Sequence, residues 1–343
     1  MANKKKILVF GAAGFIGTYL IDELVKQGHE VLASDISSLG QKYYQHHQIP
    51  YFPIDITKEA DFKKIEGQTF DAVIHLAALQ PANFSNEKYQ PKDYININVV
   101  GTTNILEFCR NNKVGKIIYA SSHRNTSGMW HKNKPIKEED GRAQQYEGEY
   151  SMFSISESAA QDCVEFYRNQ YGFKGIIFRL PPVYGYGPHL EIFKDGKPIM
   201  TGFQTFIENA IACKPLEIWG NPDVGRDIIY VKDVVSAFVQ AINLDSAEGL
   251  YNITSNYSLT LREQVKTIAK VFWGDTTEPK IIEVPEKPHR MDSFVYDNSK
   301  AKRELNWNLE YNFEQMLIDY KKERDKNKFG FLLEKRKDMF KGA

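Results

Sequence analysis

The sequence predicts an α/β fold in which a doubly wound parallel sheet carries a smaller C-terminal α/β lobe. Short apolar runs alternate with helically spaced segments through the first half, as parallel strands alternate with crossover helices. A glycine-rich turn joins the first apolar run to the first helical segment. Beyond residue 181, Gly and Pro clusters replace this alternation, as expected of a small lobe over the open end of the sheet.

The individual elements follow from the spacing of apolar residues. Strands are expected at 7–10, 31–34, 72–76, 116–120 and 175–179, and helices at 17–27, 91–111 and about 151–171. These elements form a predicted nucleotide-binding domain at 1–180. A mainly substrate-binding lobe is expected at 181–325, with segments interleaved with the first domain, and a charged tail at 326–343. The Lys-, Arg- and Glu-rich stretch at 321–341 predicts a solvated terminal helix.

The composition favours chemistry on a small molecule. Lys plus Arg and Asp plus Glu both number 44, so no excess charge attracts nucleic acid or an anionic membrane surface. No apolar run approaches the roughly 18 residues that a membrane helix requires. Cys109, Cys163 and Cys213 are widely spaced among apolar neighbours, which predicts reduced core thiols rather than disulfides or a metal site. We therefore expect a cytoplasmic protein without a metal.

The turn after the first strand predicts a dinucleotide site. It reads Gly11-Ala12-Ala13-Gly14-Phe15-Ile16-Gly17 and opens directly into a helix. Glycines at such a turn let the backbone approach a pyrophosphate and direct the helix N-terminus at its negative charge. Asp35 ends the second strand, where a carboxylate accepts hydrogen bonds from the ribose beside adenine and repels a 2′-phosphate. The expected cofactor is therefore NAD rather than NADP.

Further blocks of sequence resemble the extended short-chain dehydrogenase/reductase superfamily, in particular its NAD-dependent nucleotide-sugar epimerases and dehydratases. In chain order they are Asp55-Ile56, His75-Leu76-Ala77-Ala78, Asn98-Val99-Val100-Gly101-Thr102, Tyr119-Ala120-Ser121-Ser122, Arg179 with Val183-Tyr184-Gly185, the segment 225–234, and Arg290 followed by Asn298-Ser299-Lys300-Ala301. The resemblance implies a Rossmann-like fold and a homodimer formed through the helices at 91–111 and 151–171. It also implies further cofactor contacts from Asp55, Ile56, Leu76, Ala77, Ala78, Asn98, Ser121, Pro181 and Val183.

The same resemblance implies a nucleoside diphosphate sugar as substrate, transformed by epimerisation or dehydration through a transient keto sugar. Arg226 and Arg290 match the arginines that hold the diphosphate in this family, and a guanidinium forks well onto phosphate. Arg124 is a further candidate for substrate binding. Pro182 stands where the family often has Asn, which leaves the identity of the sugar open.

The resemblance breaks at the catalytic pair. The family carries Tyr-x-x-x-Lys on the helix before the 175–179 strand, so that both side chains share one helix face. The Lys lowers the phenol pKa while the Tyr exchanges a proton with the sugar hydroxyl. Here the matching positions are Phe153 and Glu157, and no lysine occurs between residues 138 and 173.

Three interpretations of this departure remain open. In the first, Ser122, at the family's catalytic Ser/Thr position, acts with His123, Arg124, Tyr150 or Glu157 in a rearranged site. In the second, the protein binds nucleotide and sugar without turnover. In the third, the two residues were introduced into an ordinary epimerase or dehydratase. A sugar reductase or dehydrogenase that releases NADH in each cycle is a further alternative.

Overall fold

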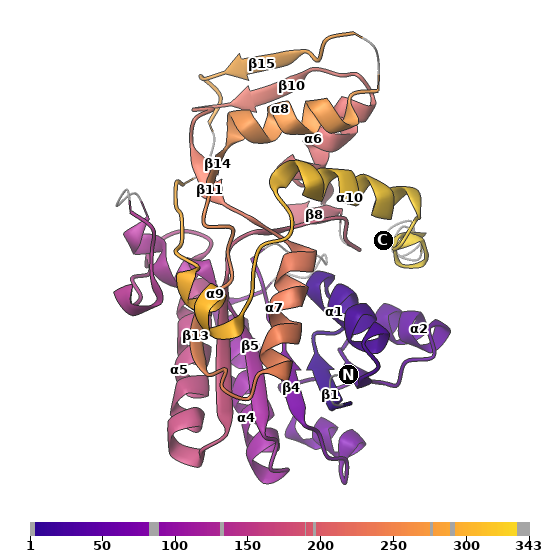
Figure 1. Ribbon diagram of the computed structural model, residues 1–343, viewed down its shortest axis with the longest axis vertical. Helices are drawn as coiled ribbons and strands as arrows, with labels where there is room; N and C mark the ends of the chain where they lie inside the picture. Colours follow the sequence, from indigo (N-terminus) through magenta and orange to yellow (C-terminus); the bar gives the residue numbers. More distant parts are fainter. Residues whose placement is uncertain are drawn as a thin grey trace.

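The computed structural model describes residues 4–81, 89–130, 134–188, 190–194, 197–274, 277–288 and 292–334. Its centre is a parallel sheet of seven strands in the order β13-β6-β5-β4-β1-β2-β3 (Figure 1). The strands are β1 (Lys6–Phe10), β2 (Glu30–Ser34), β3 (Tyr51–Phe52), β4 (Ala72–His75), β5 (Lys116–Ser122), β6 (Lys174–Leu180) and β13 (Gly249–Asn252). Chain order reverses between β1 and β4, which is the switch point where ligands bind in doubly wound sheets.

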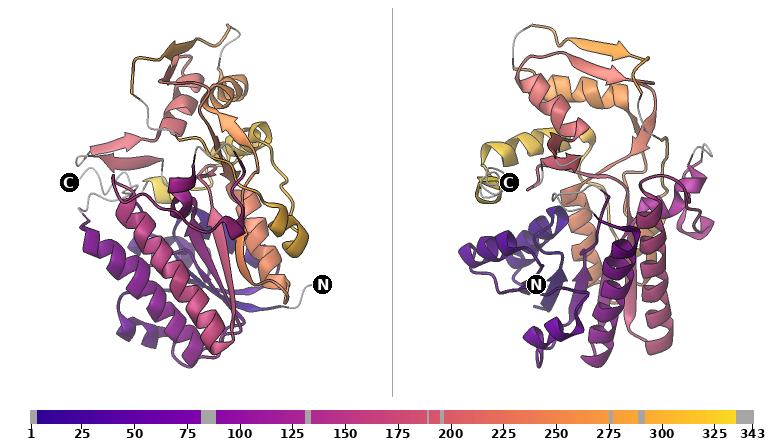
Figure 2. Two further views of the ribbon diagram at one scale, coloured as in Figure 1. Left: turned by 90° about the vertical axis from the view of Figure 1, so that its left-hand side faces the viewer. Right: turned by 180° about the vertical axis from the view of Figure 1, so that it is seen from behind.

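Helices cover both faces of this sheet. On one face lie α1 (Phe15–Lys26), α2 (Ser38–His46) and α7 (Val231–Asn243). On the other lie α3 (Pro91–Tyr94), the π-helix η2 (Ile95–Val100), α4 (Gly101–Asn111) and α5 (Ser151–Tyr171), with α4 and α5 side by side (Figure 2). The strands read as continuous apolar runs because alternate residues enter two cores: Ile7 and Val9 pack towards α1, and Leu8 and Phe10 towards α4.

A second lobe lies beyond the C-terminal ends of the strands (Figure 1). Its elements are β8 (Glu191–Lys194), β9 (Lys197–Met200), α6 (Gly202–Ile211), β10 (Leu216–Trp219), β11 (Gly225–Asp227), β14 (Ser258–Thr260), α8 (Leu261–Phe272), β15 (Ile281–Val284) and α10 (Phe313–Asp325). The short strands β7 (Val183–Tyr184) and β12 (Ile229–Tyr230) pair in parallel where the chain passes between the lobes. The chain returns to the first lobe through α7, β13 and later α9 (Ser299–Leu305).

Short 3-10 helices complete the first lobe: η1 (Glu59–Ile65), η3 (His123–Met129) and η4 (Glu138–Asp140). The fold class predicted from the sequence is confirmed, as are the five strands and three helices of the first half within a few residues. The helix expected at 91–111 contains the π-helical segment η2, and β13 joins the sheet from far along the chain. The division into domains at residue 181 stays a prediction.

Two local expectations were wrong. Cys213 is exposed and has a positive φ of 52°, so it is not a core thiol. The tail is not simply solvated, because Phe329 is fully buried with its ring 5.6 Å from that of Tyr19, and Lys328 is ion-paired with Asp22. Apolar side chains in the charged stretch therefore attach the described part of the tail to α1; residues 335–343 lie outside the described residues.

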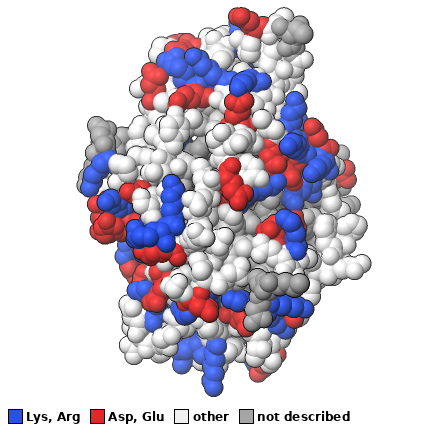
Figure 3. Space-filling view, viewed as in Figure 1, with Lys and Arg blue, Asp and Glu red and all other residues white. Residues whose placement is uncertain are grey.

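The surface carries no dominant charge on the face shown in Figure 3, where Lys and Arg lie among Asp and Glu. In the described ranges, no helix combines the length and apolarity needed to cross a membrane. The cytoplasmic location stays a prediction.

Candidate active site

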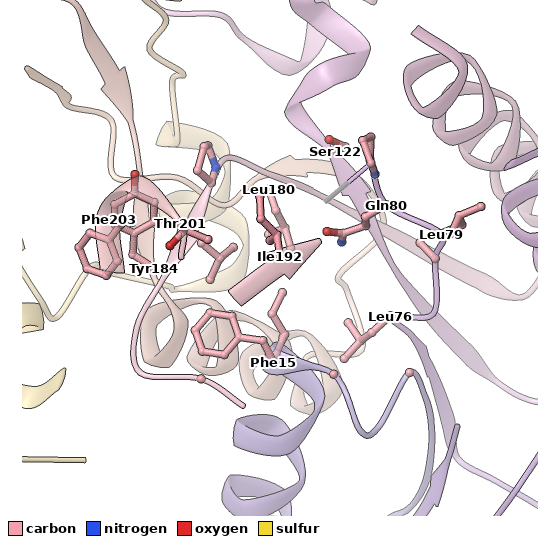
Figure 4. Close-up of a pocket in the computed structure, with 18 of the residues that line it drawn as sticks. Phe15, Leu76, Leu79, Gln80, Ser122, Leu180, Tyr184, Ile192, Thr201 and Phe203 are labelled. Carbon is pink, nitrogen blue, oxygen red and sulfur yellow. The ribbon is translucent and has the colours of Figure 1, made fainter. Parts of the chain in front are cut away.

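A cavity of about 2000 Å³ lies between the C-terminal ends of the strands and the second lobe. Figure 4 shows side chains from both lobes facing this space, with Phe15, Leu76 and Ser122 from the sheet side and Thr201 and Phe203 from the second lobe. Most of the predicted site residues line it: Gly11, Gly14, Phe15, Ile16, Gly17, Asp35, Asp55, Ile56, Leu76, Ala77, Ala78, Ser121, Ser122, His123, Arg124, Tyr150, Phe153, Glu157, Pro181, Pro182, Val183 and Arg226.

The glycine turn forms a cradle that side chains would fill. Gly11 has φ +78°, and a Cβ there would lie 2.6 Å from the Ala77 nitrogen. A Cβ on Gly17 would lie 2.4 Å from the Gly11 carbonyl oxygen. Gly14 precedes α1 without a side-chain cap, so the first amides of the helix are open to an anion. This arrangement fits the diphosphate of the expected NAD.

Asp35 is held in place beside this turn. Its two carboxylate oxygens accept hydrogen bonds from the backbone amides of Ala13 (3.1 Å) and Ser37 (3.0 Å). Burial raises the pKa of Asp35, and these amide bonds act in the opposite direction. The side chain therefore has a fixed orientation at the cavity wall, where a ribose could meet it.

Asn98, one of the predicted cofactor contacts, lies behind the wall rather than in it. Its side chain bonds both backbone groups of Leu79, accepting from the amide (2.7 Å) and donating to the carbonyl (3.1 Å), and also donates to the Ser156 hydroxyl (2.9 Å). The π-helical turn that carries Asn98 therefore fastens the segment after β4 to α5.

Phe153 and Glu157 lie on one face of α5 and both line the cavity. Glu157 is only 2 % exposed. The Tyr119 hydroxyl donates to its Oε2 (2.9 Å), while Oε1 is buried and has no hydrogen-bond partner among the described residues. Glu157 is therefore not a solvated helix carboxylate.

The charge state of Glu157 follows from this burial. Desolvation raises its pKa to about 8, and the hydrogen bond from Tyr119 only partly opposes the shift. Near pH 7 the group is a neutral carboxylic acid. It can donate or accept a hydrogen bond, but it cannot supply the positive field of the lysine that the family resemblance implies at this position.

His123, a candidate for proton transfer, does not titrate near neutrality. Its Nδ1 lies 3.1 Å from the Leu180 carbonyl oxygen, and its ring packs on Trp130 and Phe294 at 5.5 and 5.2 Å. Burial, helped by the charge of Arg124, lowers its pKa well below the usual value. The neighbouring Ser122 hydroxyl accepts from the Arg124 amide (3.2 Å), which fixes the start of η3.

The other candidates also surround this end of the cavity. The guanidinium of Arg124 lies 3.8 Å from the centre of the Tyr150 ring. Arg226 faces the cavity from β11. Pro182 lies at the turn between β6 and β7, and its carbonyl accepts from the Ile229 amide (3.1 Å). Arg290 lies outside the described residues.

Sequence reasoning missed Tyr119 as the partner of Glu157. The alternation of side chains along a strand could have indicated it. Residues two apart on β5 share a face, and Ser121 faces α5, where it donates a hydrogen bond to Gln161 (3.2 Å). Tyr119 is therefore expected to face α5 as well. It also missed Trp219 and Lys214, which line the cavity from the second lobe. Their positions follow from the packing of that lobe, for which the local sequence carries no comparable signal.

Comparison with known proteins places this geometry among nucleotide-sugar enzymes. The NAD dependent epimerase/dehydratase family matches residues 7–254. A UDP-N-acetyl-alpha-D-glucosaminuronate decarboxylase from Bacillus cytotoxicus is 30% identical over 287 residues, covering 82% of this chain and 84% of the relative. A UDP-glucuronate 4-epimerase from Thermodesulfobacterium geofontis is 28% identical over 323 residues, covering 90% and 93%.

Solved structures agree with this fold. The UDP-glucose 4-epimerase of Thermotoga maritima, determined with UDP-glucose, superposes with a TM-score of 0.78 at 24% identity, covering 94% of this chain and 99% of that one. The UDP-glucose 4-epimerase of Thermus thermophilus, in complex with NAD, has a TM-score of 0.73 at 24% identity, covering 92% and 97%. The family expected from the motifs is confirmed by the match over residues 7–254, and with it NAD as the family's cofactor.

Proposed function

Since the chain belongs to the NAD dependent epimerase/dehydratase family, we propose that it binds a nucleoside diphosphate sugar and epimerises or dehydrates it through a transient keto sugar. The observation that carries the proposal is a single cavity. It joins the glycine cradle and Asp35 at one end to Tyr150, Ser122 and Arg226 at the other. Cofactor and sugar would therefore meet inside one cavity.

NAD, when bound, would accept a hydride from a sugar carbon and return it within one turnover. The residues that would hold it are the glycine turn, through its open amides, and Asp35, through its carboxylate. Arg226 would bind the substrate diphosphate; what supports this is that it lines the cavity and that its buried Nε has no hydrogen-bond partner among the described residues.

Proton exchange with the sugar falls to Tyr150 in this proposal. Tyr150 precedes Phe153 by three residues, which brings both side chains to the same side of the helix start. Burial raises the pKa of Tyr150, while the charges of Arg124 and Arg226 lower it. Ser122 offers a hydroxyl beside the same space, and neutral Glu157 offers a hydrogen bond. The arginine charges would assist the phenolate where relatives use a lysine.

The test is incubation of the purified protein with NAD and a panel of UDP-, dTDP-, GDP- and CDP-sugars, with products identified by mass spectrometry and NMR. An epimer or a dehydrated sugar is expected. Tyr150→Phe should lower the rate by about 10²- to 10⁴-fold, as loss of a general acid/base does. Tyr146→Phe is the matched control, because Tyr146 is 75% exposed and does not line the cavity.

Two results would contradict this function and support a different one. Binding of NAD and sugar without any product would support a non-catalytic homologue, which Phe153 at the tyrosine position favours. NADH accumulating in proportion to product would support a reductase or dehydrogenase.

A homodimer is also proposed, through the outer surface of α4 and α5. Large apolar side chains are exposed on and just before these helices: Ile95, Val100, Phe166 and Tyr171. Exposed apolar surface of this kind is typical of an interface. Light scattering on the eluted protein should give twice the chain mass, and Phe166→Glu should shift it towards the monomer.

A further inference from the structure

Two arginines lie at the reaction end of the cavity. Arg124 follows β5 in the first lobe, and Arg226 lies on β11 in the second. Both line the cavity. Within the described ranges, neither guanidinium is within 4 Å of a carboxylate oxygen. Both arginines are half-buried, and a guanidinium that faces a cavity can offer its N–H groups to an anion, so these two point to an anionic ligand.

The groups around Arg124 act on its charge in both directions. Burial has the largest influence and lowers the pKa of Arg124, Tyr150 and Asp292 raise it, and the charge of Arg226 lowers it. Apart from Glu157, the carboxylates that line the cavity belong to different parts of the wall: Asp35 follows β2, Asp55 follows β3, and Glu217 is ion-paired with Lys287 at 2.6 Å. The Arg124 side of the cavity therefore favours negative charge.

Arg124 is also held ready for a planar anion. Its amide donates to the Ser122 hydroxyl (3.2 Å), and its carbonyl accepts from the Ser154 hydroxyl (2.8 Å). Its guanidinium lies over the rings of Tyr150 and Trp130, 3.8 and 5.1 Å from their centres. Stacking occupies the faces of the guanidinium and leaves its N–H edges available for a forked bond to a carboxylate.

The position of Arg124 assigns this anion to the sugar rather than to the diphosphate. Arg124 lies one residue beyond His123 and two beyond Ser122, and it contacts Tyr150. In the proposed function that is where the sugar ring reacts, whereas Arg226 serves the diphosphate from the other lobe. We infer that the substrate is a nucleoside diphosphate uronic acid, whose carboxylate binds Arg124. This inference rests on the proposed function.

The experiment measures binding of three probes by calorimetry in the presence of NAD: UDP, UDP-glucose and UDP-glucuronate. The wild type should bind UDP-glucuronate about 10- to 100-fold more tightly than UDP-glucose, as expected for a charged, forked hydrogen bond. Arg124→Gln should remove that preference and leave the affinity for UDP unchanged, which also shows that the variant folds. Arg124→Lys should keep part of the preference, because the charge remains and the fork is lost.

Two control variants separate the possible outcomes. Arg226→Gln should weaken the binding of all three probes to the same extent. Arg303→Gln, on the exposed surface of α9, should leave the affinity for each probe unchanged. Equal wild-type affinity for UDP-glucose and UDP-glucuronate would overturn the inference. The inference would also be overturned if Arg124→Gln weakened the binding of UDP as much as that of UDP-glucuronate, because Arg124 would then bind the diphosphate. If UDP, dTDP, GDP and CDP all failed to bind, the proposed function itself would fall.

Discussion

The two ends of the cavity differ in how their residues are constrained. At the cofactor end, Gly17 approaches the backbone of Gly11 so closely that no side chain fits. At the reaction end, Phe153 and Glu157 occupy positions defined by side-chain packing, and Glu157 finds a new partner in Tyr119. Backbone geometry leaves little freedom to change, whereas a side-chain pair can be replaced if its neighbours accommodate it. The glycine turn thus keeps the family pattern, whereas residues 153 and 157 depart from it.

The largest expected effect tests the cofactor end of the cavity, where backbone geometry constrains the residues. Gly17→Val places a Cβ 2.4 Å from the Gly11 carbonyl oxygen, so the turn must shift. Overpacking of this kind costs about 1–3 kcal/mol of unfolding free energy, and we expect NAD affinity to fall by more than about 100-fold, because the displaced amides no longer face the phosphates. Calorimetry and denaturant titration measure both quantities. Gly115→Ala is the control, since its Cβ meets only an ordinary contact at 3.8 Å.

The second prediction tests the reaction end of the cavity with the double variant Phe153→Tyr and Glu157→Lys. In a site that relies on Tyr150, an ammonium at residue 157 would be buried against the Tyr119 hydroxyl with no anion, so turnover should fall by about 10- to 100-fold. Product formation with the preferred sugar measures the effect. A gain in rate would instead identify the chain as an ordinary epimerase or dehydratase with two introduced residues.

The third prediction concerns cofactor choice. Asp35→Asn removes the charge that would bind the ribose hydroxyls while keeping an oxygen for one of the two backbone amides. NAD affinity should fall by about tenfold, and the preference for NAD over NADP should narrow. Binding of both cofactors is compared with that of Asp71→Asn, whose carboxylate accepts from the Lys6 amide at the opposite end of β1. An unchanged NAD to NADP ratio would remove Asp35 from the specificity argument.

The last prediction extends the comparison to pH. The folded pKa of Glu157 is about 8 and its ordinary value is 4.5, so folding takes up a proton between these values. Stability should therefore fall as pH rises from about 5 to 8, by at most about 1.4 kcal/mol per pH unit. Glu157→Gln mimics the neutral acid and should lose part of this slope, so its melting temperature should exceed that of the wild type most clearly near pH 8. Parallel melting curves for the two proteins would contradict a buried neutral acid.

Several features of the molecule were predictable from local sequence. Strands and helices of the first half follow from apolar spacing, and the cradle follows from glycines where strand and helix meet. The absence of the usual catalytic pair could also be read directly, because the i, i+4 relation of Phe153 and Glu157 needs no tertiary knowledge. These properties depend on residues that are near neighbours in the chain.

The tertiary structure determined three properties of the site: the protonation state of Glu157, the neutral state of His123 and the stacking of Arg124 on Tyr150. Tyr119 and Glu157 are 38 residues apart, and His123 meets Phe294 only after the second lobe has packed against the first. Protonation depends on how much water and which charges surround a group, and those neighbours come from distant segments. The chain alone therefore determined that a dinucleotide fold carries Phe153 and Glu157 where the family pattern has Tyr and Lys, whereas packing determined which of the polar groups around them are neutral, which are charged and which face the cavity.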